Sequence, residues 1–320
     1  MTSRVSLSLL AALFVGCAPA AAQGRVGLPS IPLPEEMRSL QSVGVPAEPG
    51  PIEQAPAIEE EELQEKIPAL DLPSRPSGAK TGTQFLDSLE GLGRGAIDKR
   101  VLEEVLSGNV PAYQRTLTPI TLAGESGAVA TLHVMTDYLA IGSDENFIRM
   151  PMTSAAAQTI CDELDMSLPT KKVVDEIYLQ SKAKLPPSYI DGGPTEDELA
   201  DFLFHHETLE TRRKKAGFEL GELLAGHKKD IVLSTRLRER HDRVAIYGWH
   251  KKDGTVIQPL SCKHSCRYAD YSHGVRLVAQ AMTIDDAPRR FSEVIGDLDE
   301  ADIVSDEGPL TVREYPRTLP

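Results

Sequence analysis

Five of the eight histidines in this chain lie between His227 and His273. The same window contains the only tryptophan and three of the eight tyrosines. An imidazole can give or take a proton near neutral pH and can bind a metal ion, and an aromatic ring can pack against a substrate. This combination of side chains predicts a functional site in the C-terminal half of the chain.

Ten residues of this window form the predicted site. The predicted catalytic residues are His227, Asp230, His250, His264, Asp270 and His273. The residues predicted to shape a substrate groove are Tyr247, Trp249, Tyr268 and Tyr271. In this scheme a histidine acts as acid or base, and Asp230 or Asp270 orients an imidazole through its second nitrogen. For each histidine alone, packing or simple exposure is the alternative. The pair His205–His206 and His241 are expected to be exposed.

A metal site is the second interpretation of the same residues. His264 and Asp270, with His250 or His273, could supply the two nitrogens and one oxygen of a catalytic zinc with an open position. This set resembles the His and Asp ligands of zinc peptidases that cleave D-Ala-D-Ala peptides. The spacing from His to Asp is shorter here, and no glutamate corresponds to the catalytic one near Trp249–His250. The cofactor therefore stays open, either none or zinc.

Two cysteines of the mature chain lie on either side of His264 in the sequence. Cys262 and Cys266 could form a local disulfide that stiffens the loop around His264, because disulfides persist in oxidising compartments. Cys161 is expected to be a buried packing residue on its helix rather than a nucleophile.

The first residues have the pattern of a signal peptide. Arg4 gives a positive start, Leu7 to Val15 form an apolar core, and Ala20 to Ala22 precede a cleavage site before Gln23. Residues 1–22 are therefore predicted to direct export to the periplasm or the cell exterior. The alternative is a lipoprotein attached through Cys17. No segment has the roughly 20 apolar residues that a membrane-spanning helix needs.

Residues 23–80 differ in composition from the rest of the chain. Between Gly24 and Lys80 there are ten prolines, four consecutive glutamates at 59–62 and no aromatic residue. Such a segment buries too little apolar surface to offset its chain entropy, so we expect a disordered linker. The remaining residues, 81–320, are long enough for a single domain.

The charge distribution argues against nucleic acid as a partner. The formal net charge is −14, whereas a phosphate backbone requires concentrated lysine and arginine. The basic runs 212–215 and 236–240 have acidic neighbours. Each is expected to be a solvated helix face or turn.

The pattern of apolar residues and turn signals predicts strands, then helices, then strands. Helix is expected over 81–106 with a glycine break, followed by three strands within 115–152. Helices are expected over 153–164 and 169–185, from 195 onward and over 207–224. Strands are expected over 230–234, 243–249, 255–260 and 274–283, with short helices at 288–295 and 300–304. This order favours an α+β fold, in which a helical block is inserted between two groups of strands of a largely antiparallel sheet.

The expected function is an exported hydrolase that acts on a cell-wall or other polysaccharide-containing polymer through the His/Asp/Tyr site. The sequence contains no nucleophile elbow, phosphate-binding loop, dinucleotide fingerprint or His-Glu-x-x-His motif. Asp144, Glu145 and Glu307 are reserve carboxylates for glycoside hydrolysis. The alternatives are a polysaccharide lyase that uses His and Tyr, and a non-catalytic envelope protein that binds glycan or peptidoglycan.

Overall fold

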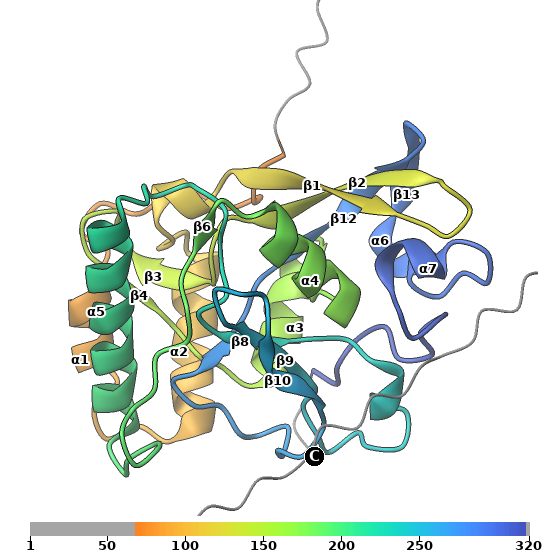
Figure 1. Cartoon of the computed structure of the whole chain (residues 1–320). Coiled ribbons are helices and arrows are strands. Elements are labelled where there is room, and N and C mark those ends of the chain that lie inside the picture. Colours follow the sequence, from red (N-terminus) through yellow and green to blue (C-terminus); the bar gives the residue numbers. More distant parts are fainter. Residues whose placement is uncertain (1–67, 318–320) are drawn as a thin grey trace, which may run out of the picture. The chain divides into compact units, whose positions relative to one another are not determined.

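The computed structural model describes residues 68–317 (Figure 1). The predicted signal peptide, Cys17 and most of the predicted linker lie outside the described residues. The fold is mixed α+β with mostly antiparallel sheets, which confirms the expected class. Within the described range, no helix is both long and apolar enough to cross a bilayer.

The larger sheet joins the two groups of strands. Its order is β1–β2–β12–β13, with the short β5 beside β12. The bounds are β1 Leu117–Ala123, β2 Val129–Met135, β5 Met166–Ser167, β12 Val278–Ile284 and β13 Ala287–Arg290. All pairings in this sheet are antiparallel, so the last long strand returns to lie against the first hairpin.

The prediction of a helix from residue 288 is wrong at its start. Asp285 and Asp286 both have positive φ, at 48° and 64°, and they form the tight turn between β12 and β13. Two consecutive residues of this kind suit a hairpin because their twist matches that of the strands. Helix α6 is reduced to Phe291–Val294.

The second sheet carries half of the ten predicted site residues. Its order is β10–β9–β8–β11. The bounds are β8 Lys229–Ile231, β9 Ile246–His250, β10 Val256–Ser261 and β11 His273–Gly274. The predicted β9–β10 hairpin is confirmed, with Gly254 at a φ of 84° in its turn. Strand β11 is parallel to β8 and places His273 opposite Lys229, although 44 residues separate them in the sequence.

Two short pairs complete the strands. β3 Ala140–Gly142 is antiparallel to β4 Phe147–Arg149, and β6 Ala183–Lys184 is parallel to β7 Leu224–Ala225.

The helices begin at side-chain caps that the sequence contains. Thr153, Thr170 and Asp197 each accept a hydrogen bond from a backbone N–H in the first turn of α3, α4 and α5. The bounds are α1 Gly82–Asp87, α2 Arg94–Leu106, α3 Ser154–Glu163, α4 Lys171–Gln180, α5 Glu198–Ala216 and α7 Ala301–Val304.

Two helix boundaries differ from those predicted. Helix α4 stops before residue 185, because Ser181 is extended and the following residues pair with β7. Helix α5 is one continuous helix where two were expected, and it ends at Gly217 in the left-handed conformation.

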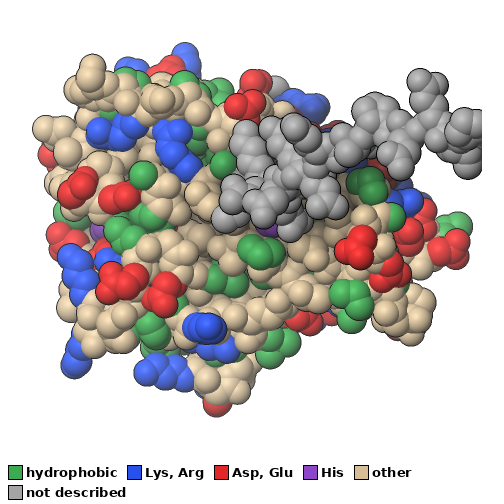
Figure 2. All heavy atoms as spheres, turned by 90° about the horizontal axis from the view of Figure 1, so that it is seen from above, with side chains coloured by type: hydrophobic (Ala, Val, Ile, Leu, Met, Phe, Trp, Pro, Cys, Tyr) green, Lys and Arg blue, Asp and Glu red, His purple; other side chains and the backbone are tan. Residues whose placement is uncertain are grey.

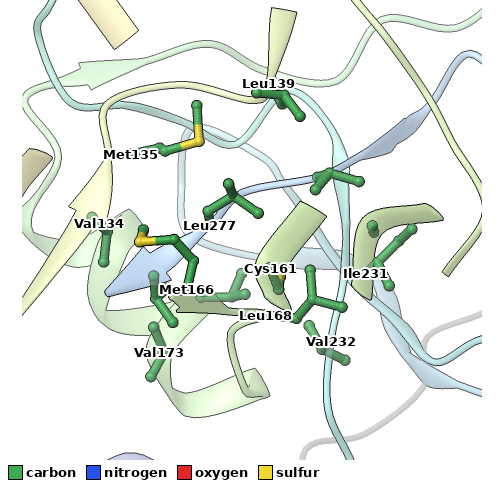
Figure 3. Close-up of a cluster of buried hydrophobic side chains, with 14 of the residues drawn as sticks. Val134, Met135, Leu139, Cys161, Met166, Leu168, Val173, Ile231, Val232 and Leu277 are labelled. Atoms are coloured by element: carbon green, nitrogen blue, oxygen red, sulfur yellow. The ribbon is translucent and has the colours of Figure 1, made fainter. Parts of the chain in front are cut away.

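Helix α4 contacts both β1 and β9, so it lies between the two sheets (Figure 1). The core beneath it contains side chains from several of these elements, including Val134, Leu168, Val173 and Leu277 (Figure 3). Cys161 points into the same cluster, where burial raises the pKa of its thiol. Packing on its helix, as the sequence suggested, explains this cysteine.

The domain begins earlier than Thr81. Leu70 is buried, Ala69 bridges to Thr116, and the Pro68 carbonyl accepts a hydrogen bond from the Leu117 N–H at 2.9 Å. The last residues of the predicted linker are therefore packed against β1.

The C-terminal segment is held by Tyr315. Its buried hydroxyl donates to the Val232 carbonyl at 2.7 Å and accepts from the Ala245 N–H at 3.0 Å. It thus joins the chain beyond β8 to the chain before β9.

We expect Tyr315→Phe to destabilise the domain by about 1–3 kcal/mol, because two buried backbone groups lose their partner. The exposed Tyr189→Phe is the control, with a change within about 0.5 kcal/mol. Urea denaturation of both variants measures the difference, and equal midpoints would contradict this role for Tyr315.

Candidate functional site

Asp270 lies on the loop between β10 and β11 and has a fixed set of hydrogen-bond donors. Its Oδ2 accepts from the Tyr268 hydroxyl at 2.9 Å, and its Oδ1 accepts from the Ser272 hydroxyl at 2.5 Å and N–H at 2.8 Å. Burial alone would raise the pKa of this carboxyl, but His273, Ser272 and Lys229 outweigh it and lower the pKa to about 2. Asp270 is therefore ionised at neutral pH.

A cleft of about 330 Å³ opens beside Asp270. It is lined by Tyr268 and Tyr271 of the loop and by Asp201 and Phe202 of α5. The remaining lining residues are Arg94, Pro194, Thr195, Glu196, Glu198, Arg267 and Ala269. Of the ten predicted site residues, Asp270, Tyr268 and Tyr271 line this cleft.

Two more predicted residues, His264 and His273, lie against Tyr268. The His264 ring stacks on Tyr268 with centroids 4.5 Å apart and lies 6.1 Å from the His273 ring. His273 is fully buried, and neither of its ring nitrogens has a hydrogen-bond partner among the described atoms. Burial lowers the pKa of His273 to about 4, so its imidazole is neutral at pH 7.

His205 belongs to this region, contrary to the prediction of an exposed helix surface. It is 1% exposed, both ring nitrogens lack a partner among the described atoms, and its ring lies 5.0 Å from that of Tyr271. Asp201, His205, Leu209 and Arg213 recur at intervals of four and form the buried stripe of α5. That spacing was the signal in the sequence that could have identified His205. His241 is exposed, as predicted.

Lys228 is a buried cation that the sequence analysis missed. It is 3% exposed, and its Nζ donates to the Tyr271 carbonyl at 2.6 Å. Burial, followed by the charge of Arg149, lowers the pKa of this ammonium to about 7. A lysine that can lose its proton near neutral pH is a common feature of functional sites.

Lys228 should make stability depend on pH in a defined window. Its pKa is about 7 in the fold, against 10.5 when unperturbed, so the unfolded chain binds more protons between these values. The contribution of Lys228 to stability therefore rises as pH increases from about 7 to about 10.5, and a penalty remains at lower pH.

We expect Lys228→Met to stabilise the domain most at pH 6, relative to the native protein, and progressively less toward pH 10. Urea denaturation of both proteins at pH 6, 8 and 10 tests this. The exposed Lys252→Met serves as the control for loss of an ordinary lysine charge. A difference that does not change with pH would show that Lys228 keeps an ordinary pKa.

His227 is part of a different, fully buried network. Its Nε2 lies 3.2 Å from Asp137, and Asp137 accepts from Arg149 at 2.6 Å. Arg149 also donates to Glu210 of α5 at 2.8 Å. Burial lowers the pKa of His227 to about 4, with Asp137 opposing the shift. The carboxylate that orients His227 is thus Asp137 and not Asp230.

We expect Arg149→Met to cost about 3–5 kcal/mol of stability, because Asp137 would lose its buried cation and Glu210 would keep only Arg213. Arg100→Met removes an exposed arginine that pairs with Glu103, and it should cost less than about 1 kcal/mol. Urea denaturation compares them, and a loss below 1 kcal/mol for Arg149→Met would contradict the dependence on this cation.

Asp230 has other partners. Its carboxyl accepts from the Tyr138 hydroxyl at 2.8 Å and lies 3.9 Å from the Arg276 guanidinium. Burial raises the pKa of Asp230 to about 6. These contacts join β8 to the segment after β2.

His250 and Tyr247 form a third cluster, away from Asp270. The Asp175 carboxylate of α4 accepts from the Tyr247 hydroxyl at 2.7 Å and lies 3.2 Å from the His250 Nε2. The His250 ring also stacks on Tyr178, with centroids 4.3 Å apart. These contacts explain both residues as links between α4 and β9.

Trp249 is buried rather than open to a groove. Its φ is 60°, and its indole N–H donates to the His227 carbonyl at 3.1 Å. The ring packs against the Lys229 ammonium and the exposed Tyr189.

The zinc set is not assembled. His250 lies in the α4 cluster, and no group of three His, Cys, Asp or Glu side chains within residues 68–317 is arranged to hold a metal ion. Cys262 and Cys266 are buried free thiols, so the local disulfide is not formed. The reserve carboxylates Asp144, Glu145 and Glu307 do not line the cleft beside Asp270.

Comparisons with family models, with curated proteins and with solved structures each gave no match.

Proposed function

We propose that the cleft beside Asp270 is the active site of a hydrolase that acts outside the cytoplasm on a polysaccharide-containing polymer. The observation that carries this proposal is the ionised Asp270 carboxylate in a cleft that is also lined by Asp201, a buried carboxyl group of α5. Glycoside hydrolysis commonly uses two carboxyl groups that flank the bond.

The charge state of Asp270 favours one of the two roles. A carboxyl with a pKa of about 2 does not donate a proton at neutral pH. It suits the residue that stabilises the positive charge developing on the sugar ring, or that attacks it. The Tyr268 and Ser272 donors hold the carboxylate in one orientation, which such a role requires.

The role of general acid is assigned to Asp201, which also lines the cleft. The Asp201 carboxyl accepts from the Thr195 N–H at 2.7 Å and from its hydroxyl at 2.9 Å, and it is buried. It is held on the first turns of α5, so its position is set by a rigid element. In this scheme Asp201 protonates the leaving oxygen and later activates the water that completes hydrolysis.

The apolar surface of the cleft fits a sugar. Tyr268, Tyr271 and Phe202 line it, and aromatic faces pack well against the C–H groups of a pyranose ring. His264 and His273 lie against Tyr268 and act in this scheme by fixing the loop. His227, Asp230 and His250 receive no catalytic role, because their contacts hold other elements together.

We expect Asp270→Asn to reduce polymer hydrolysis by on the order of 10²–10⁴-fold, because the amide carries no negative charge. The assay is the release of new reducing ends from purified peptidoglycan and from neutral polysaccharides. Asp87→Asn, at an exposed position of α1, is the control and should keep full activity.

Three outcomes would contradict the proposed hydrolase activity or its assignment to Asp270. An unsaturated product that absorbs in the near ultraviolet would identify a lyase. Saturable binding without any change in polymer length would identify a binding protein. Full activity of a folded Asp270→Asn variant would place the chemistry elsewhere.

A further inference from the structure

A second cleft, of about 450 Å³, is lined mainly by cations. Its charged residues are Arg236, Arg238, Arg240, Lys263 and a single carboxylate, Glu239. The remaining lining residues are Thr235, Leu260, Ser261 and Cys262. Four positive groups against one negative group is an unusual balance in a chain whose net charge is −14. We name this site the arginine cleft.

Buried contacts and hydrogen bonds fix the backbone of the arginine cleft. Leu237 is buried, and Ser234 caps the short 3-10 turn Thr235–Leu237 by accepting from the Arg236 N–H at 3.1 Å. Glu307 accepts from the Ser234 and Thr235 hydroxyls at 3.1 Å and 3.0 Å. The turn therefore presents its arginines from a fixed base, which lowers the entropy lost when a ligand binds.

Three of the four cations are available for a ligand, whereas Arg236 also lies 3.9 Å from the Glu307 carboxylate. Arg236 donates to the Leu260 carbonyl at 2.6 Å, which directs its guanidinium toward β10. Arg238, Arg240 and Lys263 are exposed, and within the described part of the chain their side chains form no hydrogen bond or ion pair.

The arginine cleft and the cleft beside Asp270 share one loop. The loop from Cys262 to Ser272 begins at the end of β10 in the arginine cleft and ends at Asp270. It is fixed in its middle, because Arg243 bridges to Ser265 and the Cys266 N–H donates to the Asp242 carbonyl at 2.8 Å. The two ends of one loop therefore line the two clefts.

We propose that the arginine cleft binds oxyanion groups, carboxylate or phosphate, of an acidic glycan whose backbone is the substrate of the Asp270 cleft. Guanidinium groups match the geometry of both anions with paired N–H donors. The inference rests on the proposed function, since it names the class of polymer for that site.

Nucleic acid is the competing polyanion, and the lining argues against it. No aromatic side chain lines the arginine cleft. Binding of single strands usually combines positive charge with aromatic rings on which the bases stack. A glycan with spaced acidic groups needs the charges alone.

The test compares Arg238→Gln/Arg240→Gln with Lys214→Gln/Lys215→Gln, which removes two exposed charges from the end of α5. Binding to the full chain is measured by calorimetry with an oligogalacturonide, a glycan phosphodiester and a neutral oligosaccharide of equal length. We expect the arginine variant to lose about tenfold in affinity for at least one acidic glycan and to show a weaker salt dependence. Its affinity for the neutral glycan should not change, and the lysine variant should match the native protein for all three probes.

The two acidic probes distinguish carboxylate from phosphate as the preferred group. Equal losses in both variants, or no loss in either, would overturn the inference, and so would tighter binding of a single-stranded oligonucleotide than of either acidic glycan. Asp270→Asn separates the two proposals. Suppose that acidic glycan binds Asp270→Asn and the native protein with equal affinity, that the arginine variant binds it more weakly, and that neither protein cleaves it. The arginine cleft is then confirmed as an anion site, and the proposed hydrolase activity is wrong.

Discussion

The buried Arg149 guanidinium is the interaction on which the arrangement of the site depends. It lies on β4 and bonds Asp137, which follows β2, and Glu210, which lies on α5. Burying a guanidinium away from water costs free energy, so Arg149 stays buried only when both carboxylates are in place. The position of α5 relative to the strands is thereby set, and α5 in turn supplies the Asp201 and His205 side chains beside the Asp270 loop. Asp137 extends the same network to His227.

Burial, more than pairing, determines the charge of the groups in this region. Burial keeps the imidazoles of His227 and His273 neutral at pH 7 and brings the pKa of Lys228 to about 7. Asp270 and Asp137 are exceptions, because their partners outweigh burial and lower the pKa of each carboxyl group. The region therefore combines ionised carboxylates with largely neutral imidazoles. The face in Figure 2 mixes acidic and basic side chains and shows little histidine, and four of the eight imidazoles are buried.

The sequence predicted the fold class and most elements, because hydrophobic period and capping residues such as Thr153 and Thr170 act locally. It predicted less of the site. Residues Tyr247 and Trp249 were grouped by proximity in sequence, but positive φ at Gly248 and Trp249 breaks the alternation of β9 and separates their side chains. Asp137 and Lys228 gain their roles from partners 12 to 43 residues away, Arg149 and the Tyr271 carbonyl. Local sequence patterns do not predict such long-range contacts.

The loop from Cys262 to Ser272 explains why a cluster visible in the sequence is only partly a cluster in space. It has almost no regular structure, so its shape is set by anchors at Ser265, Cys266 and Asp270. Cys262 and Lys263 at its start line the arginine cleft, Cys266 is buried, and residues 267–271 line the cleft beside Asp270, so Lys263 and Tyr268 belong to different surfaces. A loop fixed at several points can hold a carboxylate as precisely as a strand does, while its open side remains accessible to a polymer. That combination supports assigning both surfaces to one extended ligand rather than to two small ones.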